Sequence, residues 1–199
     1  MFKQPAHYSP LRIFNNLLTV LVIILGFYLI FMPLWPQISF WLNNTFGSSN
    51  NPYQSILSTD DSKKNIPKEN RLVIPQMNLD AVINDGPYAG TLKKGLWRRP
   101  STSTPEKSGN TVIVGHRFTY RGPAIFYHLD VLKVNDSFSL YWNGKEYAYK
   151  VREVKVVEPN ETSVEGPTTQ PTLTLYTCTP MWTSKQRLVV VADLIKEAI

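Results

Sequence analysis

The chain has 199 residues, is 43% hydrophobic, and carries a formal net charge of +6 at pH 7. That length predicts one domain with extensions, and 15 prolines with 10 glycines favour a loop-rich β protein over a helical bundle. The mild charge gathers only at Lys93, Lys94, Arg98 and Arg99, which argues against a nucleic-acid-binding stripe. A single cysteine excludes an intrachain disulfide, and the scattered histidines predict neither a metal site nor a cofactor.

An apolar run dominates the amino-terminal region. Leu17–Met32 holds no charged residue and the apolar character continues to Leu42, about the length that crosses a hydrocarbon core. Lys3 and Arg12 precede the run and no Lys or Arg follows until Lys63, so the amino terminus is expected in the cytoplasm and the remainder outside. A cleaved signal peptide is the alternative, but the run is long and no small-residue cleavage site follows it.

The composition divides the chain into four parts. They are a cytoplasmic amino terminus (1–12), a transmembrane anchor with an interfacial segment (13–42), a polar linker rich in Asn and Ser (43–65) and a folded domain (66–199). Pro33 and Pro36 are expected to end the anchor helix near the outer surface.

The folded domain contains seven short strand-like segments separated by turn signals. They are residues 71–74, 80–84, 110–116, 137–142, 145–158, 172–178 and 187–195. Asn143-Gly144 predicts a type I′ hairpin, and a short helix or turn is expected around 126–132. With little helix between the strands, the pattern predicts an all-β domain that closes, or nearly closes, into a barrel.

Alternation assigns the faces of the last two strands. In "TLTLYTC", Leu173 and Leu175 point one way and Cys178 points the other way. In "RLVVVADL", Arg187 lies on the face opposite Leu188. If the leucines pack inward, Cys178 and Arg187 both point outward, at either end of one short connection.

Cys178 is a candidate nucleophile, and such a cysteine needs a group that generates thiolate and a donor for the oxyanion. His116 ends an apolar strand, and histidine is a common general acid and base in catalysis. Arg187 stays protonated and can donate to a developing oxyanion. Each residue alone has a plainer interpretation: a small buried cysteine, a hydrogen-bonded structural histidine and a surface ion pair. The three residues together favour a catalytic site with a cysteine nucleophile.

Several motifs together resemble the sortases, the cysteine transpeptidases of bacterial surfaces. "TLYTC" is followed by Arg at the ninth position, with "VGHR" upstream. "IPQMNLDAVI", "LKKGLWRRP", "SGNTVIVGHR" and "QRLVVVADL" are similar to further sortase segments. The resemblance covers most of 66–199 and implies a sortase-like catalytic domain, an eight-stranded sortase-type β-barrel with short helices or turns behind an amino-terminal transmembrane helix. The short "TPMWTSKQ" run looks more like classes D and E than class C.

The resemblance also implies roles for individual residues. Cys178 would attack the threonine carbonyl of an LPXTG-like sorting signal on a surface protein, and His116 would protonate the leaving amine. Arg187 would stabilise the oxyanion, and Thr177 would help to shape the substrate groove. An amine from a cell-wall precursor or a pilin lysine would then resolve the thioacyl-enzyme, without any cofactor.

Two other functions stay open on the sequence. One is a non-catalytic, membrane-tethered β-barrel that binds a ligand, with an inert thiol. The other is a different exported thiol transpeptidase, such as an L,D-transpeptidase, although the Ser-His-Gly-Cys-like context of those enzymes is absent. His128 is expected on a partly exposed connecting segment outside the site. Trp97 is either a neighbour of the site or a plain core aromatic residue.

Overall fold

The computed structural model describes residues 10–46 and 66–198. The chain divides into two compact units, Met1–Ser48 and Ser49–Ile199, which are described separately below. Residues 47–65, which hold most of the predicted linker, lie outside the described part.

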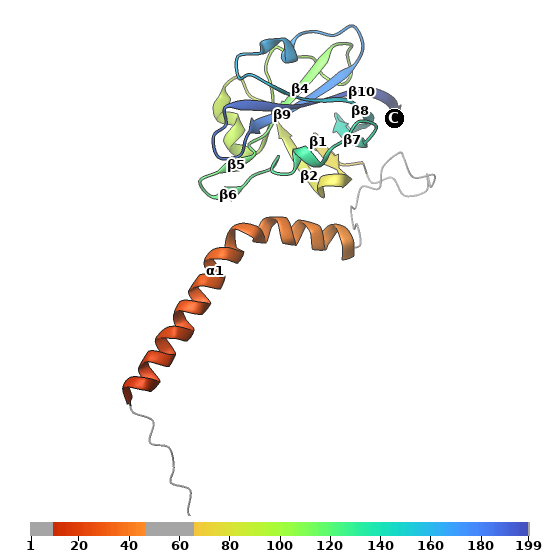
Figure 1. Ribbon diagram of the computed structural model, residues 1–199. Helices are drawn as coiled ribbons and strands as arrows, with labels where there is room; N and C mark the ends of the chain where they lie inside the picture. Colours follow the sequence, from red (N-terminus) through yellow and green to blue (C-terminus); the bar gives the residue numbers. More distant parts are fainter. Residues whose placement is uncertain (1–9, 47–65, 199) are drawn as a thin grey trace, which may run out of the picture. The chain divides into compact units, whose positions relative to one another are not determined.

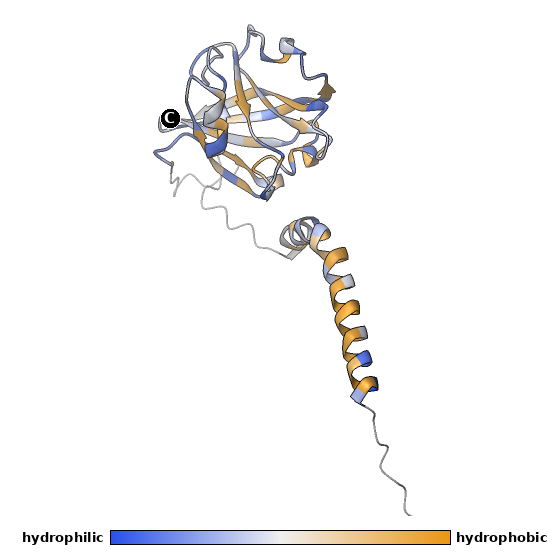
Figure 2. Cartoon of the chain, turned by 90° about the vertical axis from the view of Figure 1, so that its left-hand side faces the viewer, coloured by the Kyte–Doolittle hydropathy of each residue, from blue (hydrophilic) through white to orange (hydrophobic). Residues whose placement is uncertain are grey.

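The described part of the first unit is one apolar helix, α1, which runs from Pro10 to Phe46. The stretch Pro10–Leu42 is long and apolar enough to cross a membrane (Figure 2). The prediction that Pro33 and Pro36 end the helix was wrong, because both lie inside it. A proline removes one helical hydrogen bond and bends a helix whose neighbouring turns persist, and α1 is visibly bent in Figure 1.

In the second unit, eight strands of the described residues form a closed barrel (Figure 1). The barrel order is β1-β2-β3-β4-β9-β10-β8-β7. The strands are β1 (Arg71–Ile74), β2 (Leu79–Asn84), β3 (Leu96–Arg98), β4 (Asn110–Val114), β7 (Ser137–Trp142), β8 (Lys145–Val157), β9 (Thr172–Thr179) and β10 (Gln186–Ala198). The predicted all-β barrel is confirmed.

Short elements fill the connections between the barrel strands. β5 (Phe118–Thr119) and β6 (Gly122–Pro123) form a small hairpin. The 3₁₀ helices are η2 (Pro75–Met77), η3 (Ala89–Lys94), η4 (Leu129–Val131) and η5 (Thr162–Glu165). η4 lies where the sequence predicts a short helix or turn.

The β7–β8 hairpin follows the predicted turn chemistry. Asn143 and Gly144 have φ angles of 49° and 74°, the left-handed values that a type I′ turn requires at both central positions. Trp142 and Lys145 form the last strand pair before the turn. This hairpin sets the register of the two strands.

The inner face of the barrel is apolar. Leu173 and Leu175 of β9 and Leu188 and Val190 of β10 belong to the core cluster, which the alternating pattern predicts. Burying a leucine or valine side chain stabilises a fold by about 1.5–3 kcal/mol relative to exposure. The inward leucines therefore fix which face of β9 and β10 is left for Cys178 and Arg187.

Two parallel contacts place distant segments side by side. β2 pairs with β3, and β4 pairs with β9, in parallel. β9 then pairs with β10 in an antiparallel ladder. The strands that precede His116, contain Cys178 and contain Arg187 are consequently three neighbours in the barrel wall.

Candidate active site

Cys178 is the second-last residue of β9. Its side chain is half-buried and its thiol is free. Leu173 and Leu175 lie in the core, so alternation places Cys178 on the outer face of the wall together with Tyr176. The face predicted for Cys178 from the sequence therefore agrees with the structure.

Arg187 lies directly across from Cys178 in the β9–β10 ladder. Opposed residues of an antiparallel pair project from the same face of the sheet, with Cβ atoms about 4.5–5.5 Å apart. Nη1 of Arg187 donates to the carbonyl oxygens of Ser184, at 3.0 Å, and Gln186, at 2.9 Å. Within the described residues this guanidinium pairs with no carboxylate, so donor capacity is left for a substrate oxygen.

His116 follows β4 by two residues. The last parallel pair of β4 and β9 joins Val114 to Tyr176, and the Gly115 amide donates to the Tyr176 carbonyl at 3.4 Å. Extending this register by two residues brings the half-buried His116 level with Cys178. The structure thus brings His116, Cys178 and Arg187 to one end of three adjacent strands.

Gly115 permits a close approach between the strand end that carries His116 and the Phe126 ring. A Cβ atom there would lie 2.7 Å and 2.9 Å from ring atoms of Phe126, which is fully buried. The Phe126 amide also donates to the His116 carbonyl at 2.9 Å. Any larger residue at position 115 would have to displace the ring or the strand end that carries His116.

Thr177 is only 1% exposed. Its Oγ1 donates to the Gly115 carbonyl at 2.8 Å, so it ties the strand of the cysteine to the backbone before the histidine. The structure places this side chain within the barrel wall, away from the face that Cys178 occupies. Any effect of Thr177 on a substrate groove acts through the position of Gly115 and His116.

A family model described as the sortase domain matches residues 72–195, more than half of the chain. The chain belongs to the sortase family. The matched region includes the three candidate residues and all eight barrel strands in whole or in part.

Two curated relatives are similar to part of this sortase. Sortase D of Bacillus subtilis (strain 168) is 29% identical over 93 residues, which cover 47% of this chain and 44% of the relative. Sortase SrtE1 of Streptomyces coelicolor is 31% identical over 106 residues, covering 48% and 30%. The match therefore spans less than half the length of either relative, and both names agree with the leaning toward classes D and E.

Solved sortase structures share the fold. A lid mutant of Sortase A from Corynebacterium diphtheriae superposes with a TM-score of 0.60 at 28% identity, covering 65% of this chain and 71% of that one. The Clostridium perfringens Sortase D5 transpeptidase gives a TM-score of 0.58 at 28% identity, covering 64% and 79%.

Arg117 of this sortase was overlooked as a site residue in the sequence, where it appears only as the last letter of "VGHR". It is 6% exposed, and its Nη1 donates to Oγ1 of Thr179 at 2.9 Å. Nε donates to the Tyr127 carbonyl at 3.3 Å and Nη2 to Oδ2 of Asp130 at 2.6 Å. Arg117 thus joins the segment after His116 to the residue after Cys178.

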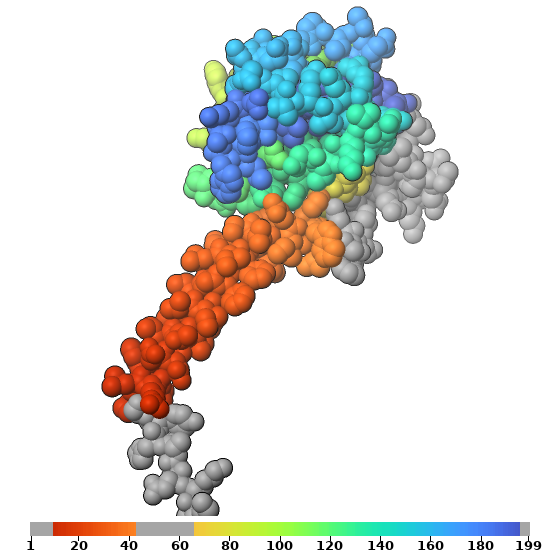
Figure 3. Space-filling view, viewed as in Figure 1, coloured from red at the N-terminus to blue at the C-terminus, as the bar shows by residue number. Residues whose placement is uncertain are grey.

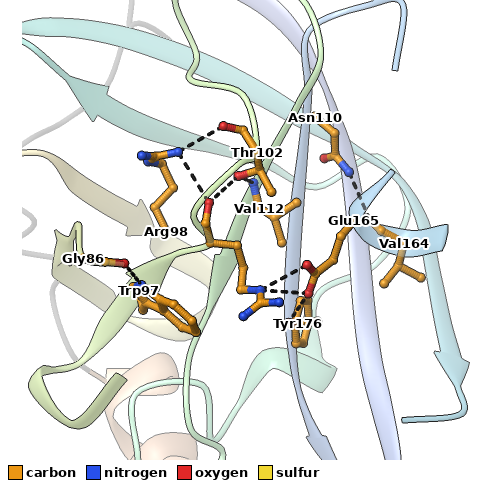
Figure 4. Close-up of polar contacts among 10 residues, drawn as sticks. Gly86, Trp97, Arg98, Thr102, Asn110, Val112, Val164, Glu165 and Tyr176 are labelled. Atoms are coloured by element: carbon orange, nitrogen blue, oxygen red, sulfur yellow. Dashed lines mark hydrogen bonds and ion pairs between the residues drawn. The ribbon is translucent and has the colours of Figure 1, made fainter. Parts of the chain in front are cut away.

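A polar network supports the outer face beside Cys178 (Figure 4). The Tyr176 hydroxyl donates to Oε1 of Glu165 at 2.5 Å, and Nε of Arg99 donates to both Glu165 oxygens at 3.0 and 3.1 Å. Burial, and then the hydrogen bond to the Glu165 carboxylate, raises the pKa of Tyr176 well above its usual range. Tyr176 therefore stays a neutral donor that holds η5 against β9.

Trp97 lies behind that network. Its ring is 3% exposed, the Arg99 guanidinium lies 4.9 Å from the ring centroid, and Nε1 donates to the Gly86 carbonyl at 2.9 Å (Figure 4). Trp97 pairs with Val114, which in turn pairs with Tyr176. It is therefore a buried neighbour of the outer face and sits two strands away from β9.

His128 lies on the connecting segment, as expected. It immediately precedes η4 and packs edge-on against Tyr127 with ring centroids 4.7 Å apart. The pKa of His128 is lowered, mainly by burial. The Asp130 carboxylate opposes this shift, and the Arg117 guanidinium adds to it. Among the described residues no group of three or more His, Cys, Asp or Glu side chains is arranged to hold a metal ion.

Proposed function

We propose that this sortase is a membrane-anchored cysteine transpeptidase that cleaves an LPXTG-like sorting signal through a thioacyl-enzyme. One observation carries the proposal: Cys178, His116 and Arg187 occupy one end of three adjacent strands in a sortase-family barrel. Cys178 lies on the outer face, where a peptide can reach it.

The first step forms a thioester. The Cys178 thiolate attacks the threonine carbonyl of the sorting signal, and the Arg187 guanidinium donates to the oxygen that gains negative charge. As the C–N bond breaks, His116 gives a proton to the leaving amine. The acyl group remains on sulfur, in a bond that needs no external energy source to react further.

The second step transfers the acyl group. An acceptor amine attacks the thioester carbonyl, a C–N bond forms, and the C–S bond breaks to regenerate the Cys178 thiolate. His116 accepts the proton that the amine loses, which restores its starting state. The acceptor is a cell-wall precursor or a pilin lysine, and the donor is a surface protein with a carboxy-terminal sorting signal.

The site would act outside the cytoplasm. α1 supplies an apolar segment that can cross a membrane, and the basic residues Lys3 and Arg12 flank its amino-terminal side. The positive-inside tendency then leaves the amino terminus in the cytoplasm and the barrel on the outer side. This topology puts the thiol where sorting signals and cell-wall amines are found.

The test uses the full chain in detergent, a panel of fluorogenic LPXTG-like peptides and an added amine. Cleavage with a Cys178-linked acyl adduct visible by mass spectrometry is expected, and Cys178→Ala should abolish both. Folded protein that cleaves no peptide in the panel, or a Cys178→Ala variant with full turnover, would contradict the proposal. An alkylation rate of Cys178 without thiolate-like titration or dependence on His116 would favour a non-catalytic binding module.

A further inference from the structure

A pocket of about 600 Å³ opens beside His116, on the side of η3 and the β5–β6 hairpin. The described residues that line it are Lys93, His116, Phe118, Thr119, Tyr120 and Arg121. Cys178 and Arg187 are not among them. His116 therefore has two sides, one toward the strands of Cys178 and Arg187 and one toward this pocket.

The described lining of the pocket is cationic. Lys93 and Arg121 contribute two positive charges, and no Asp or Glu is part of that lining. Neither cation has an ion pair with a carboxylate anywhere in residues 66–198. Two unpaired cations around one concave surface favour an anionic group within it.

Arg121 is supported without being neutralised. Its guanidinium lies 5.3 Å from the ring centroid of Tyr120, and its Nε donates to the Tyr120 hydroxyl at 3.0 Å. These contacts restrict the side chain but leave its other N–H donors available, and a guanidinium fork matches a carboxylate. Lys93, in the last turn of η3, adds a second charge from another element.

The pocket also has a structural link to the segment that follows Cys178. Phe118 of the lining packs against Trp182 with ring centroids 4.5 Å apart, and the two segments lie together on the surface in Figure 3. One wall of the pocket is therefore continuous with the connection between β9 and β10. A molecule in the pocket would be close to both the histidine and that connection.

We propose that this pocket binds the acceptor, and that it selects an amine whose molecule carries a carboxylate. The inference rests on the proposed transpeptidase function. The carboxylate would lie between Lys93 and Arg121, and the amine would face His116. The amine nitrogen would attack the thioester on Cys178, its proton would pass to His116, and the sulfur would leave as thiolate.

The experiment compares two acceptors that differ in one charge. The full chain in detergent is incubated with an LPXTG-like peptide and either triglycine or triglycinamide, and the ratio of transfer to hydrolysis is measured for each. The triglycine preference is the transfer-to-hydrolysis ratio with triglycine divided by that with triglycinamide. Because the two amines differ in intrinsic reactivity, this preference is compared between the wild type and the double variant Lys93→Gln/Arg121→Gln. Lys94→Gln is the matched control, because Lys94 is the next residue of η3 and does not line the pocket.

The triglycine preference of the double variant should be about fivefold lower than that of the wild type, while Lys94→Gln should keep the wild-type preference. Thermal melting confirms that each variant is folded. Peptide cleavage with the same preference in wild type and double variant would overturn the pocket proposal alone. An equal loss in Lys94→Gln would also overturn it, since general surface charge would then explain the effect. A wild type that cleaves no peptide would overturn the proposed function and the pocket with it.

Discussion

The connections on either side of β9 are built differently. Residues 158–171, before β9, are bound to the barrel wall through Glu165 and through Asn110, whose Nδ2 donates to the carbonyls of Val164 and Gly166 at 3.0 and 3.1 Å. Residues 180–185, after Cys178, have backbone hydrogen bonds only among themselves in the described structure, and Trp182 is 75% exposed. The first connection is held to the wall by buried and half-buried side chains, whereas the second contacts the rest of the barrel through the Phe118–Trp182 ring pair and the Arg187–Ser184 hydrogen bond.

Arg187, which follows the second connection, should affect activity strongly and stability hardly at all. Arg187→Gln should lower kcat/KM for peptide cleavage by about 10²–10³-fold, because the oxyanion loses its charged donor. The melting temperature of the full chain should hardly change, since within the described residues the Arg187 side chain bonds only to the Ser184 and Gln186 carbonyls beside it. Lys185→Gln removes an exposed charge two residues before Arg187; it is the control and should leave kcat/KM unchanged. A melting temperature that falls together with activity would show that Arg187 is structural.

Arg117 links the end of β9 to the segment after His116, and changes at this contact should affect both activity and stability. Thr179→Val removes only the contact with Nη1 of Arg117, so kcat/KM should fall about tenfold through misplacement of the Cys178 strand end. Arg117→Met also removes the bonds to Tyr127 and Asp130, and should cost about 1–3 kcal/mol of stability in addition. Peptide cleavage and thermal melting separate the two effects. Unchanged activity in Thr179→Val would remove this link from the site.

Glu165 tests the connection that is bound to the wall. Glu165→Ala leaves Arg99 and the Tyr176 hydroxyl without their shared acceptor, and should destabilise the chain by about 1–2 kcal/mol. Glu161→Ala is the matched control, because Glu161 is exposed and lies in the same connection. Among the described residues, its carboxylate accepts a hydrogen bond only from Ser163. Its melting temperature should stay close to that of the wild type. Equal melting of the two variants would mean that η5 is not held by Glu165.

His128 provides the smallest effect, and it depends on pH. Its pKa is lowered in the folded chain, mainly by burial, so the unfolded chain takes up the proton at higher pH than the folded one. Its contribution to stability is therefore present above about pH 6.5 and is lost as pH falls through the folded pKa. The melting temperature should drop more steeply between about pH 7 and pH 5 in the wild type than in His128→Gln. Parallel curves would contradict the burial effect.

Apolar patterns and turn signals in the sequence were sufficient to predict most strands of the barrel. The segments 71–74 and 137–142 form strands with the predicted bounds, because each has apolar residues up to a clear turn signal. β3, Leu96–Arg98, was missed: three residues are too short for a periodic pattern. It forms because β2 and β4 offer hydrogen bonds on both sides, which is a tertiary effect.

The same distinction applies to the site. Alternation within β9 and β10 was enough to predict the faces of Cys178 and Arg187. The position of His116 depends on the parallel β4–β9 pair, and local patterns cannot specify which distant strand becomes a neighbour. The contacts of Arg117 and Glu165 were also beyond sequence reasoning, because each joins residues that only the closed barrel brings together.

The parallel β4–β9 pair has a consequence for how the enzyme matures. The Thr177–Gly115 hydrogen bond spans 62 positions, and a parallel pair cannot be joined by a tight hairpin. Contacts with such large sequence separation form slowly, since loop closure must come first. In a newly synthesised chain Cys178 is therefore separated from His116 until β4 and β9 pair, so the reactive arrangement depends on barrel closure.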